Sequence, residues 1–168
     1  QSRSHRIELS NFEISKKRRN IIKKLTCEVS DYVQNQEVDD FFKEYYNDKG
    51  FDIMDDYNNC SKFFEPKILY LRLDGKIVAM GRYIENEKSN VFLNLAYDKN
   101  NPKLSLGTNL YYILADMTKT QNKDYFYIYE SYDDSFSYKQ KLPNIQREQI
   151  KQDIKDMIIY NQKNGIKM

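Results

Sequence analysis

The chain has 168 residues, of which 40% are hydrophobic and 31% are charged, enough for one domain with a substantial core. No apolar run approaches the roughly 20 residues that a membrane-spanning helix needs, which argues against a helical membrane protein. The single histidine, His5, is a poor candidate for a general base, and the chain has no Walker-type phosphate loop, so we expect neither a Ser/His/Asp triad nor a phosphate-loop nucleotide site. The two cysteines have no metal-ligand spacing, so we expect no metal and reduced thiols in a cytoplasmic protein, with a disulfide left open.

Positive charge is concentrated near the N-terminus. Residues 1–24 contain eight Lys and Arg against two Glu, a net charge of +6, so the rest carries −4 of the total of +2. A basic segment on a mildly acidic body is typical of a chain that binds a polyanion at one place. A solvated helix face explains the pattern equally well, and a nuclear localisation signal is a third interpretation. We expect residues 1–14 to form an extended, mobile basic arm that contains His5.

The first half of the chain alternates between helix and strand patterns. Ser15 is a candidate N-cap for a short helix that runs to about residue 24. Residues 27–33 alternate like a strand, and residues 36–48 carry apolar side chains at the i, i+3, i+4, i+7 spacing of a helix. Residues 51–64 are less regular and suggest a second short helix with a loop.

The middle of the chain carries the strongest strand signal. Residues 67–73 and 76–84 are rich in β-formers and flank Asp74-Gly75, a two-residue turn suited to a tight hairpin. A third such run, at residues 91–97, follows a polar turn. The three segments predict an antiparallel meander.

The last part of the chain predicts a helix, a strand and a final helix. A helix with one apolar stripe follows residues 103–109, and residues 125–129 form a short strand. If the intervening helix is a crossover, this strand runs parallel to its neighbour. The final helix is expected within residues 144–168, about 146–162. No linker divides the chain, so residues 1–168 are predicted to be a single domain.

The turn between the third meander strand and the next helix reads Ser-Leu-Gly-Thr at residues 105–108. The first four N–H groups of a helix lack internal partners and carry the positive end of its dipole. Such a turn is therefore a ready site for a phosphate or a carboxylate. The alternative is that Thr108 serves only as a helix cap.

The order of elements resembles the acyltransferase fold called GNAT, an α/β (α+β) fold. Its mixed, mostly antiparallel sheet is flanked by helices and opens between its fourth and fifth strands, and ligands bind at the turn there. Classical members grip coenzyme A with Gln/Arg-x-x-Gly-x-Gly/Ala at this turn. In that register the chain has Leu104, Gly107 and Asn109, so that only the central glycine matches.

Three segments resemble the C-terminal, GNAT-like domain of arginyl-tRNA–protein transferases. Residues 12–19 are similar to the family's Ser-x-x-x-Arg block, and residues 104–108 follow Tyr97-Asp98 as its Ser-Leu-Gly-Thr follows Tyr-Asp-Pro. Residues 127–143 lead through Tyr138-Lys139 to a proline, like its Tyr-Lys…Pro. The family's Tyr-Leu-Gly-Tyr reads Tyr-Ile-Tyr-Glu at residues 127–130, and its cysteine-bearing N-terminal half has no counterpart. We therefore expect either a fragment or a small stand-alone relative.

This resemblance implies an enzyme that moves an arginine-like amino acid from aminoacyl-tRNA, its co-substrate, to a protein N-terminus or a small amine, with no other cofactor. Backbone N–H groups at the turn would hold an anion or oxyanion, Tyr138 would donate to the ester oxygen, and Lys139 would hold a phosphate or carboxylate. Glu130 would orient the attacking ammonium or take its proton. The implied catalytic residues are Gly107, Glu130 and Tyr138, and the substrate-binding residues are Ser105, Leu106, Gly107, Thr108, Tyr129 and Lys139. The residues implied to contact the tRNA acceptor arm are Arg3, Arg6, Lys16, Lys17, Arg18 and Arg19, together with His5.

Two other functions remain open at this point. One is an N-acetyltransferase that uses acetyl-coenzyme A. The other is a non-catalytic GNAT-like module that binds RNA or an acidic protein through residues 1–24. The sequence leaves the oligomeric state undecided.

Overall fold

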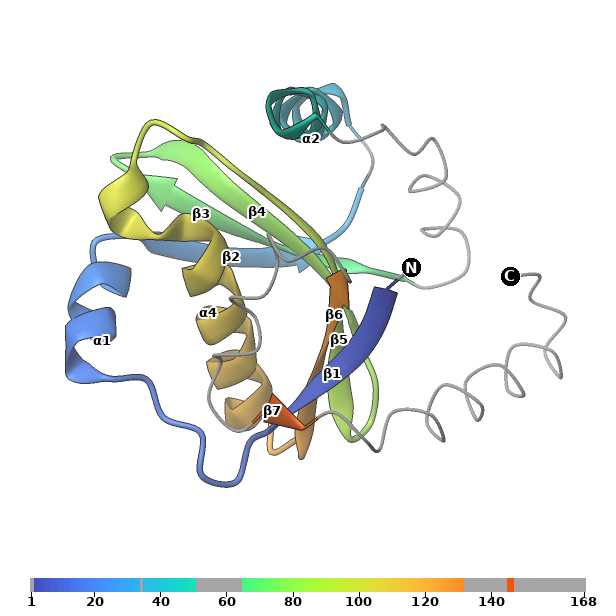
Figure 1. Cartoon of the computed structure of the whole chain (residues 1–168). Coiled ribbons are helices and arrows are strands. Elements are labelled where there is room, and N and C mark those ends of the chain that lie inside the picture. Colours follow the sequence, from blue (N-terminus) through green and yellow to red (C-terminus); the bar gives the residue numbers. More distant parts are fainter. Residues whose placement is uncertain (1, 34, 51–64, 132–144, 147–168) are drawn as a thin grey trace, which may run out of the picture.

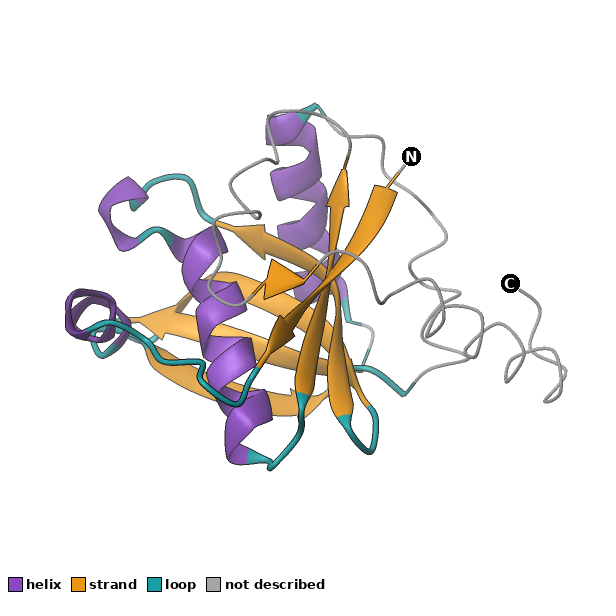
Figure 2. Cartoon of the chain, turned by 60° about the horizontal axis from the view of Figure 1, so that its bottom comes forward, coloured by secondary structure: helices purple, strands orange, loops and turns teal. Residues whose placement is uncertain are grey.

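The computed structural model describes residues 2–33, 35–50, 65–131 and 145–146. Its centre is a mixed sheet of seven strands in the order β2-β3-β4-β5-β6-β1-β7, with helices packed against it (Figures 1 and 2). The strands are β1 (Ser2–Glu8), β2 (Thr26–Asp31), β3 (Lys67–Leu73), β4 (Lys76–Glu85), β5 (Ser89–Tyr97), β6 (Tyr125–Ser131) and β7 (Ile145–Gln146). The helices are α1 (Lys16–Ile22), α2 (Gln36–Lys49), the 3₁₀ helix η1 (Pro102–Leu104) and α4 (Leu106–Thr120).

Each of the two N-terminal helices begins at a side-chain cap, and the first of these is the predicted Ser15. The Ser15 hydroxyl accepts a hydrogen bond from the Arg18 backbone N–H at 3.3 Å, which fixes the start of α1. The Asn35 side chain accepts from the Val38 N–H at 3.0 Å and caps α2 in the same way. Helix α2 ends at Gly50, whose φ of +67° is the left-handed conformation that glycine adopts readily.

The hairpin and the meander form as predicted. Asp74 and Gly75 both have positive φ, +50° and +81°, as a two-residue hairpin turn between twisted strands requires. Strands β3, β4 and β5 then pair antiparallel. Helix α2 packs its buried Val38 and Phe42 on one face of these strands, and α4 covers the other with a larger apolar cluster.

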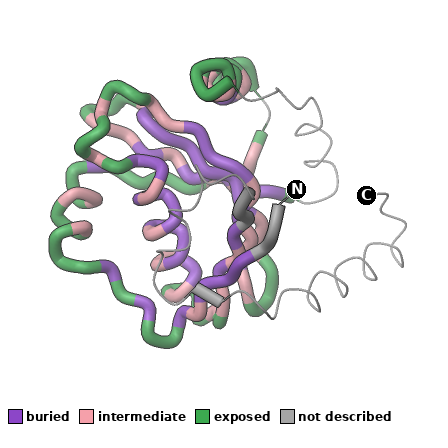
Figure 3. Tube along the Cα trace, in the orientation of Figure 1, coloured by how far each residue is buried: buried purple, intermediate pink, exposed green. Residues whose placement is uncertain are grey.

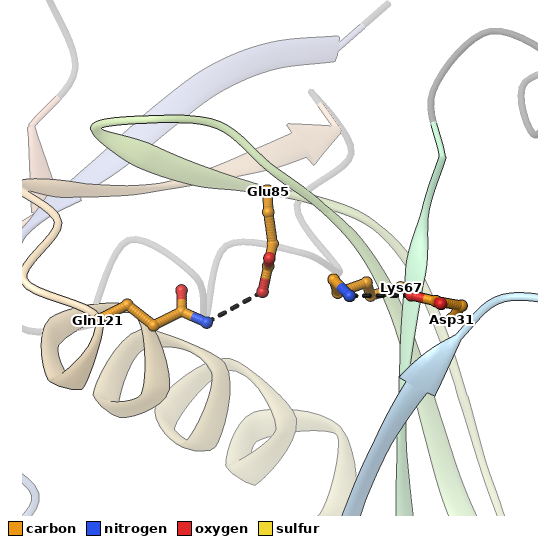
Figure 4. A network of polar contacts seen from close by, with 4 residues as sticks. All are labelled: Asp31, Lys67, Glu85 and Gln121. Carbon is orange, nitrogen blue, oxygen red and sulfur yellow. Dashed lines mark hydrogen bonds and ion pairs between the residues drawn. The ribbon is translucent and has the colours of Figure 1, made fainter.

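The sheet opens between β5 and β6, as the resemblance implied. These strands are parallel, and their register runs only from Ser89↔Tyr125 to Val91↔Tyr127. Buried Asn90 holds the closed end, since its amide donates to Thr118 Oγ1 at 3.0 Å and to Gln121 Oε1 at 2.9 Å. The Gln121 amide in turn donates to Glu85 at the end of β4, at 2.9 Å (Figure 4). Beyond this end, β5 and β6 diverge.

The N-terminal segment is part of the sheet, and the expectation of a mobile arm was wrong. Strand β1 pairs antiparallel with β6 over its whole length, from Ser2↔Ser131 to Glu8↔Tyr125. His5 and Arg6 are only 1% and 4% exposed. The buried charge is accommodated because the Arg6 guanidinium stacks 3.9 Å from the Tyr125 ring centroid. Strand β1 was missed because its sequence is polar and because its partner, β6, is more than 100 positions away in the chain.

Two expected helices fall largely outside the described residues. The second short helix, within 51–64, lies entirely outside them. Of the final helix, only residues 145 and 146 are described, and they form β7, which pairs with β1. No helix in the described part of the chain has the length and apolar character needed to cross a membrane.

Candidate active site

The Ser-Leu-Gly-Thr turn forms the start of α4, just after β5 and η1. Ser105, and not Thr108, is the N-cap residue, and its φ of +46° places it in the left-handed region, which costs a non-glycine residue of order 1 kcal/mol. Its side chain makes no capping hydrogen bond. No described residue therefore caps the first-turn N–H groups of α4, and these groups point beyond the N-terminal end of the helix.

Gly107 brings this turn into close contact with the end of β5. A Cβ atom at position 107 would lie 2.7 Å from Cε1 of Tyr97, a distance that no real side chain tolerates. The Tyr97 ring thus lies on the flank of α4, where a side chain of residue 107 would otherwise be. Leu106 and Gly107 are buried, whereas Ser105 is exposed and Thr108 is half-buried. A ligand would reach the turn along the helix axis, on the side of Ser105 and Thr108.

A chain of hydrogen bonds ties helix α1 to this turn. Arg18 Nη1 donates to Asn109 Oδ1 at 2.7 Å, and Asn109 Nδ2 donates to the Leu104 carbonyl at 2.7 Å. The Arg18 guanidinium also lies 4.0 Å from the centroid of the Tyr112 ring. Because Asn109 is fully buried, its amide must find partners inside the protein. Asn109 departs from the coenzyme A motif in sequence, and in the structure it anchors the turn.

The basic residues expected to bind RNA occupy different environments. Lys16, Lys17 and Arg19 of α1 are exposed. Figure 3 shows exposed and intermediate stretches along this helix. Arg18 is half-buried against the turn, and Arg6 is buried in β1. The backbone of Arg3 lies opposite Glu130 in the β1–β6 register. Lys16, Lys17 and Arg19 are thus available to a polyanion, and their neighbour Arg18 connects α1 to the turn.

The remaining candidate residues are placed less completely. Tyr129 and Glu130 lie on β6 past Tyr127, the last residue that pairs with β5, and so beside the opening of the sheet. Tyr138 and Lys139 lie outside the described residues. Their roles, and those of the Tyr129 and Glu130 side chains, stay predictions.

Sequence reasoning missed two features of this region. One is the pairing of Arg18 with Asn109, which are 91 positions apart, and the other is a cavity of about 140 Å³ beside Tyr97. The cavity is lined from helix α2 and from both β4 and the turn after β5. No local pattern could have found either, because each combines residues from separate elements. Among the described residues, no group of His, Cys, Asp and Glu could hold a metal ion.

No family model matches the chain, and no curated protein matches it by sequence. Solved structures do match. L-PGS from Bacillus licheniformis superposes with a TM-score of 0.56 at 18% identity, covering 76% of this chain and 46% of L-PGS. FemX superposes with a TM-score of 0.57 at 8% identity, covering 74% of this chain and 52% of FemX. The glucosamine N-acetyltransferase region of a fungal multi-domain β-N-acetylglucosaminidase superposes with a TM-score of 0.55 at 7% identity. The match covers 87% of this chain and 19% of the fungal chain.

The chain has a GNAT-like fold. It spans about half the length of L-PGS and of FemX, and the low identities carry the likeness no further than the fold. Acyltransferases are among the proteins that share this fold, and no acyl donor is singled out by it. The specific resemblance to arginyl-tRNA–protein transferases stays a prediction from the sequence motifs.

Proposed function

We propose that the protein is an aminoacyltransferase, which moves an amino acid from charged tRNA to the amine of a protein N-terminus or a small molecule. One observation carries this proposal. The opening between β5 and β6 ends at the uncapped first turn of α4, and Arg18 links that turn to the exposed cations of α1. A candidate anion site and a candidate polyanion-binding surface therefore adjoin each other. An aminoacyl-tRNA donor needs both, one for its reacting end and one for its RNA.

The reaction needs little covalent help from the protein. The acceptor ammonium first loses one proton, and its nitrogen then attacks the carbonyl carbon of the ester at the tRNA 3′ end. The C–N bond forms, the C–O bond to the ribose breaks, and the second proton passes from nitrogen to the ribose oxygen. The products are an amide and uncharged tRNA. Since the ester is already activated, positioning and stabilisation of the oxyanion supply most of the rate enhancement.

The turn residues have the clearest role in this scheme. The backbone N–H groups of Leu106, Gly107 and Thr108 would bind the oxyanion or a phosphate of the donor, with Ser105 at the edge of the site. Glu130 would take the first proton, close to where β6 leaves β5. Tyr138 would donate to the ester oxygen, with Lys139 and Tyr129 holding the substrate. An arginine-like amino acid rests on the resemblance of the motifs alone.

Filter binding to aminoacylated and uncharged forms of one tRNA tests the donor. A transferase should bind the charged form more tightly, because the aminoacyl ester adds contacts at the turn. Equal affinity for the two forms, together with a steep loss of binding in salt, would instead indicate a non-catalytic basic module. The Gly107→Val variant gives the second measurement: it should abolish transfer, and retained transfer would remove the turn from the mechanism.

A second candidate function is acetyl transfer from acetyl-coenzyme A. The observation in its favour is the TM-score of 0.55 to a glucosamine N-acetyltransferase region. Against it, Leu104 and Asn109 occupy the positions at which the coenzyme A motif has a basic and a small residue. A thermal-shift titration decides: stabilisation by micromolar acetyl-coenzyme A, with none by charged tRNA, would replace the first candidate by the second.

A further inference from the structure

The cavity of about 140 Å³ lies at the C-terminal end of β5, opposite the turn across the ring of Tyr97. One wall comes from helix α2 and the other from β4, from the end of β5 and from the residues that follow it. Its lining residues are Phe41, Glu44, Tyr45 and Asp48 on α2, with Lys76, Ile77, Tyr97, Asp98, Lys99 and Asn100 on the facing side. It is thus a cavity lined by aromatic rings, three carboxylates and two lysines, next to the candidate donor site.

Its two tyrosines already hold an ammonium group. The rings of Tyr45 and Tyr97 lie with their centroids 5.0 Å apart at 53°. Lys49 Nζ lies 5.9 Å from the Tyr45 centroid and 5.3 Å from the Tyr97 centroid. Both distances are within the range of a cation–π contact, so one ammonium is attracted by two ring faces at once.

The carboxylates of the cavity act on a second ammonium group. Lys99 Nζ pairs with Asp48 at 3.0 Å. This hydrogen bond and charge raise the pKa of Lys99 above its usual value, and the charges of Glu44 and Asp98 raise it further. Three carboxylates therefore favour a cation at this point. The Lys99 side chain is 69% exposed, so it can leave without disturbing the core.

Tyr97 connects this cation-binding cavity to the turn. Its ring lines the cavity and also lies against Gly107, at the start of α4. A group bound in the cavity is therefore separated from the donor turn by the width of one aromatic ring. An acceptor amine needs this placement, close to the donor and held through its own charge.

We propose that this cavity binds the acceptor as a primary ammonium group, and that Lys99 occupies the position beside Asp48 while no acceptor is present. The aliphatic stem of the acceptor packs against Tyr45 and Tyr97, and its ammonium takes the position beside Asp48. Calling the bound amine an acceptor rests on the function proposed above, whereas its binding does not.

Calorimetric titration with Nα-acetyl-lysine methylamide measures this binding directly, without any donor. Its neutral isostere, Nα-acetyl-norleucine methylamide, should bind at least about fivefold more weakly, because it lacks the charge that the rings and carboxylates attract. Equal affinities of the two probes, or no binding of either, would overturn the proposal.

Variants locate the site. Asp48→Asn should weaken binding of the lysine probe about fivefold, and Tyr45→Leu should do the same, with thermal unfolding showing that each variant is folded. Lys99→Met should tighten binding several-fold, because it removes the ammonium that competes for Asp48. The matched control is Asp31→Asn, which breaks the 2.9 Å pair of Asp31 with Lys67 on strands β2 and β3 (Figure 4) and should leave binding unchanged. If Asp31→Asn weakens binding as much as Asp48→Asn, or if Lys99→Met leaves it unchanged, the cavity is not the site.

The two proposals fail in different ways. If the lysine probe binds as expected and receives no aminoacyl group, the cavity stands and the proposed transferase activity falls. If the probe is aminoacylated and Asp48→Asn and Tyr45→Leu leave its KM unchanged, the activity stands and the acceptor binds elsewhere.

Discussion

Gly107 contributes no side chain, and this absence lets the ring of Tyr97 lie against α4. The ring occupies the space of the missing Cβ, with its Cε1 atom 2.7 Å from the ideal position of that atom. The glycine therefore sets how closely the turn approaches β5, in addition to offering its N–H group. A motif search identifies the glycine and says nothing of the ring that covers it.

Gly107→Ala should destabilise the protein although alanine is the better helix former. Helix propensity favours alanine by about 1 kcal/mol, whereas forcing Tyr97 aside costs about 1–3 kcal/mol, so we expect a net loss of about 1 kcal/mol. Urea denaturation measures it. In a Tyr97→Leu background the same substitution should become neutral or stabilising. Stabilisation by Gly107→Ala in the wild type would show that the ring moves away at no cost.

Tyr83 is a second residue whose effect depends on its burial. Its side chain is fully buried, and its hydroxyl has no hydrogen-bond partner among the described residues. Burial raises the pKa of Tyr83 well above its ordinary value, and the nearby Glu85 carboxylate adds to the shift. The folded state thus holds this proton more tightly than the unfolded chain. The resulting stability is constant below the unfolded pKa of about 10 and declines as the pH rises above it.

Tyr83→Phe should leave the free energy of unfolding at pH 7 unchanged or raise it by up to about 1 kcal/mol, because no hydrogen bond is lost. Between pH 10 and about pH 12 the variant should lose less stability than the wild type. Urea denaturation followed by circular dichroism at pH 7, 9 and 11 checks both. Tyr125→Phe, at a half-buried tyrosine, is the control. An identical alkaline decline in Tyr83→Phe and the wild type would contradict this account of Tyr83.

At the scale of elements, α1 is attached to the molecule by the packing of Ile22 against the core and by one basic side chain. The helix has only seven residues, none of them buried, so it cannot be stable by itself. Arg18 fixes it by its bond to buried Asn109 and by stacking on Tyr112. A residue that first suggests a polyanion surface therefore also supports the turn of α4.

Arg18→Ala should lower the free energy of unfolding by about 1–3 kcal/mol, because it leaves the buried side-chain oxygen of Asn109 without a hydrogen-bond partner. Arg18→Lys should be intermediate, since lysine keeps the charge and lacks the planar group that stacks on Tyr112. Lys17→Ala, at an exposed neighbour, should change the free energy of unfolding by less than about 0.5 kcal/mol. These values come from urea denaturation. If Arg18→Ala and Lys17→Ala are equally mild, Arg18 belongs to the solvated surface.

The elements that could be predicted are those with local signals. The β3–β4 hairpin follows from Asp74-Gly75, α1 from its cap, α2 from its apolar spacing, and the parallel direction of β6 from the crossover helix before it. Strand β1 could not be predicted, because its sequence is polar and its partner β6 is distant in the chain. The turn could be proposed as a site from Gly107 and its neighbours. The support of the turn by Asn109 and the adjoining cavity could not be predicted, since both depend on contacts between residues that are remote in the sequence.

At the scale of the whole molecule, the segregated charge predicts a salt-dependent interaction. The logarithm of the association constant for an uncharged tRNA should fall linearly with the logarithm of the salt concentration. The slope should be about 0.7–0.9 for each phosphate contact. Replacing exposed lysines of α1 and its C-terminal end with alanine should reduce this slope by about 2; the triple variant is Lys16→Ala, Lys17→Ala and Lys23→Ala. Filter binding over a series of salt concentrations measures the slope.

A matched triple variant separates local from general electrostatics. It removes three exposed lysines elsewhere on the described surface, namely Lys43, Lys76 and Lys88. This variant has the same net charge as the first and should keep the wild-type slope. Equal slopes for the two triple variants would mean that total charge, and not the surface of α1, attracts the RNA.

The pairing of β1 with β6 has a consequence for biosynthesis. The meander of β3, β4 and β5 joins neighbours in sequence and can form as soon as they leave the ribosome. Strand β1 emerges before the meander and must wait until β6 has been translated, because β6 lies between β1 and β5 in the sheet. One side of the opening is therefore completed last, and a nascent chain arrested before residue 125 would expose an unfinished sheet edge to chaperones and proteases.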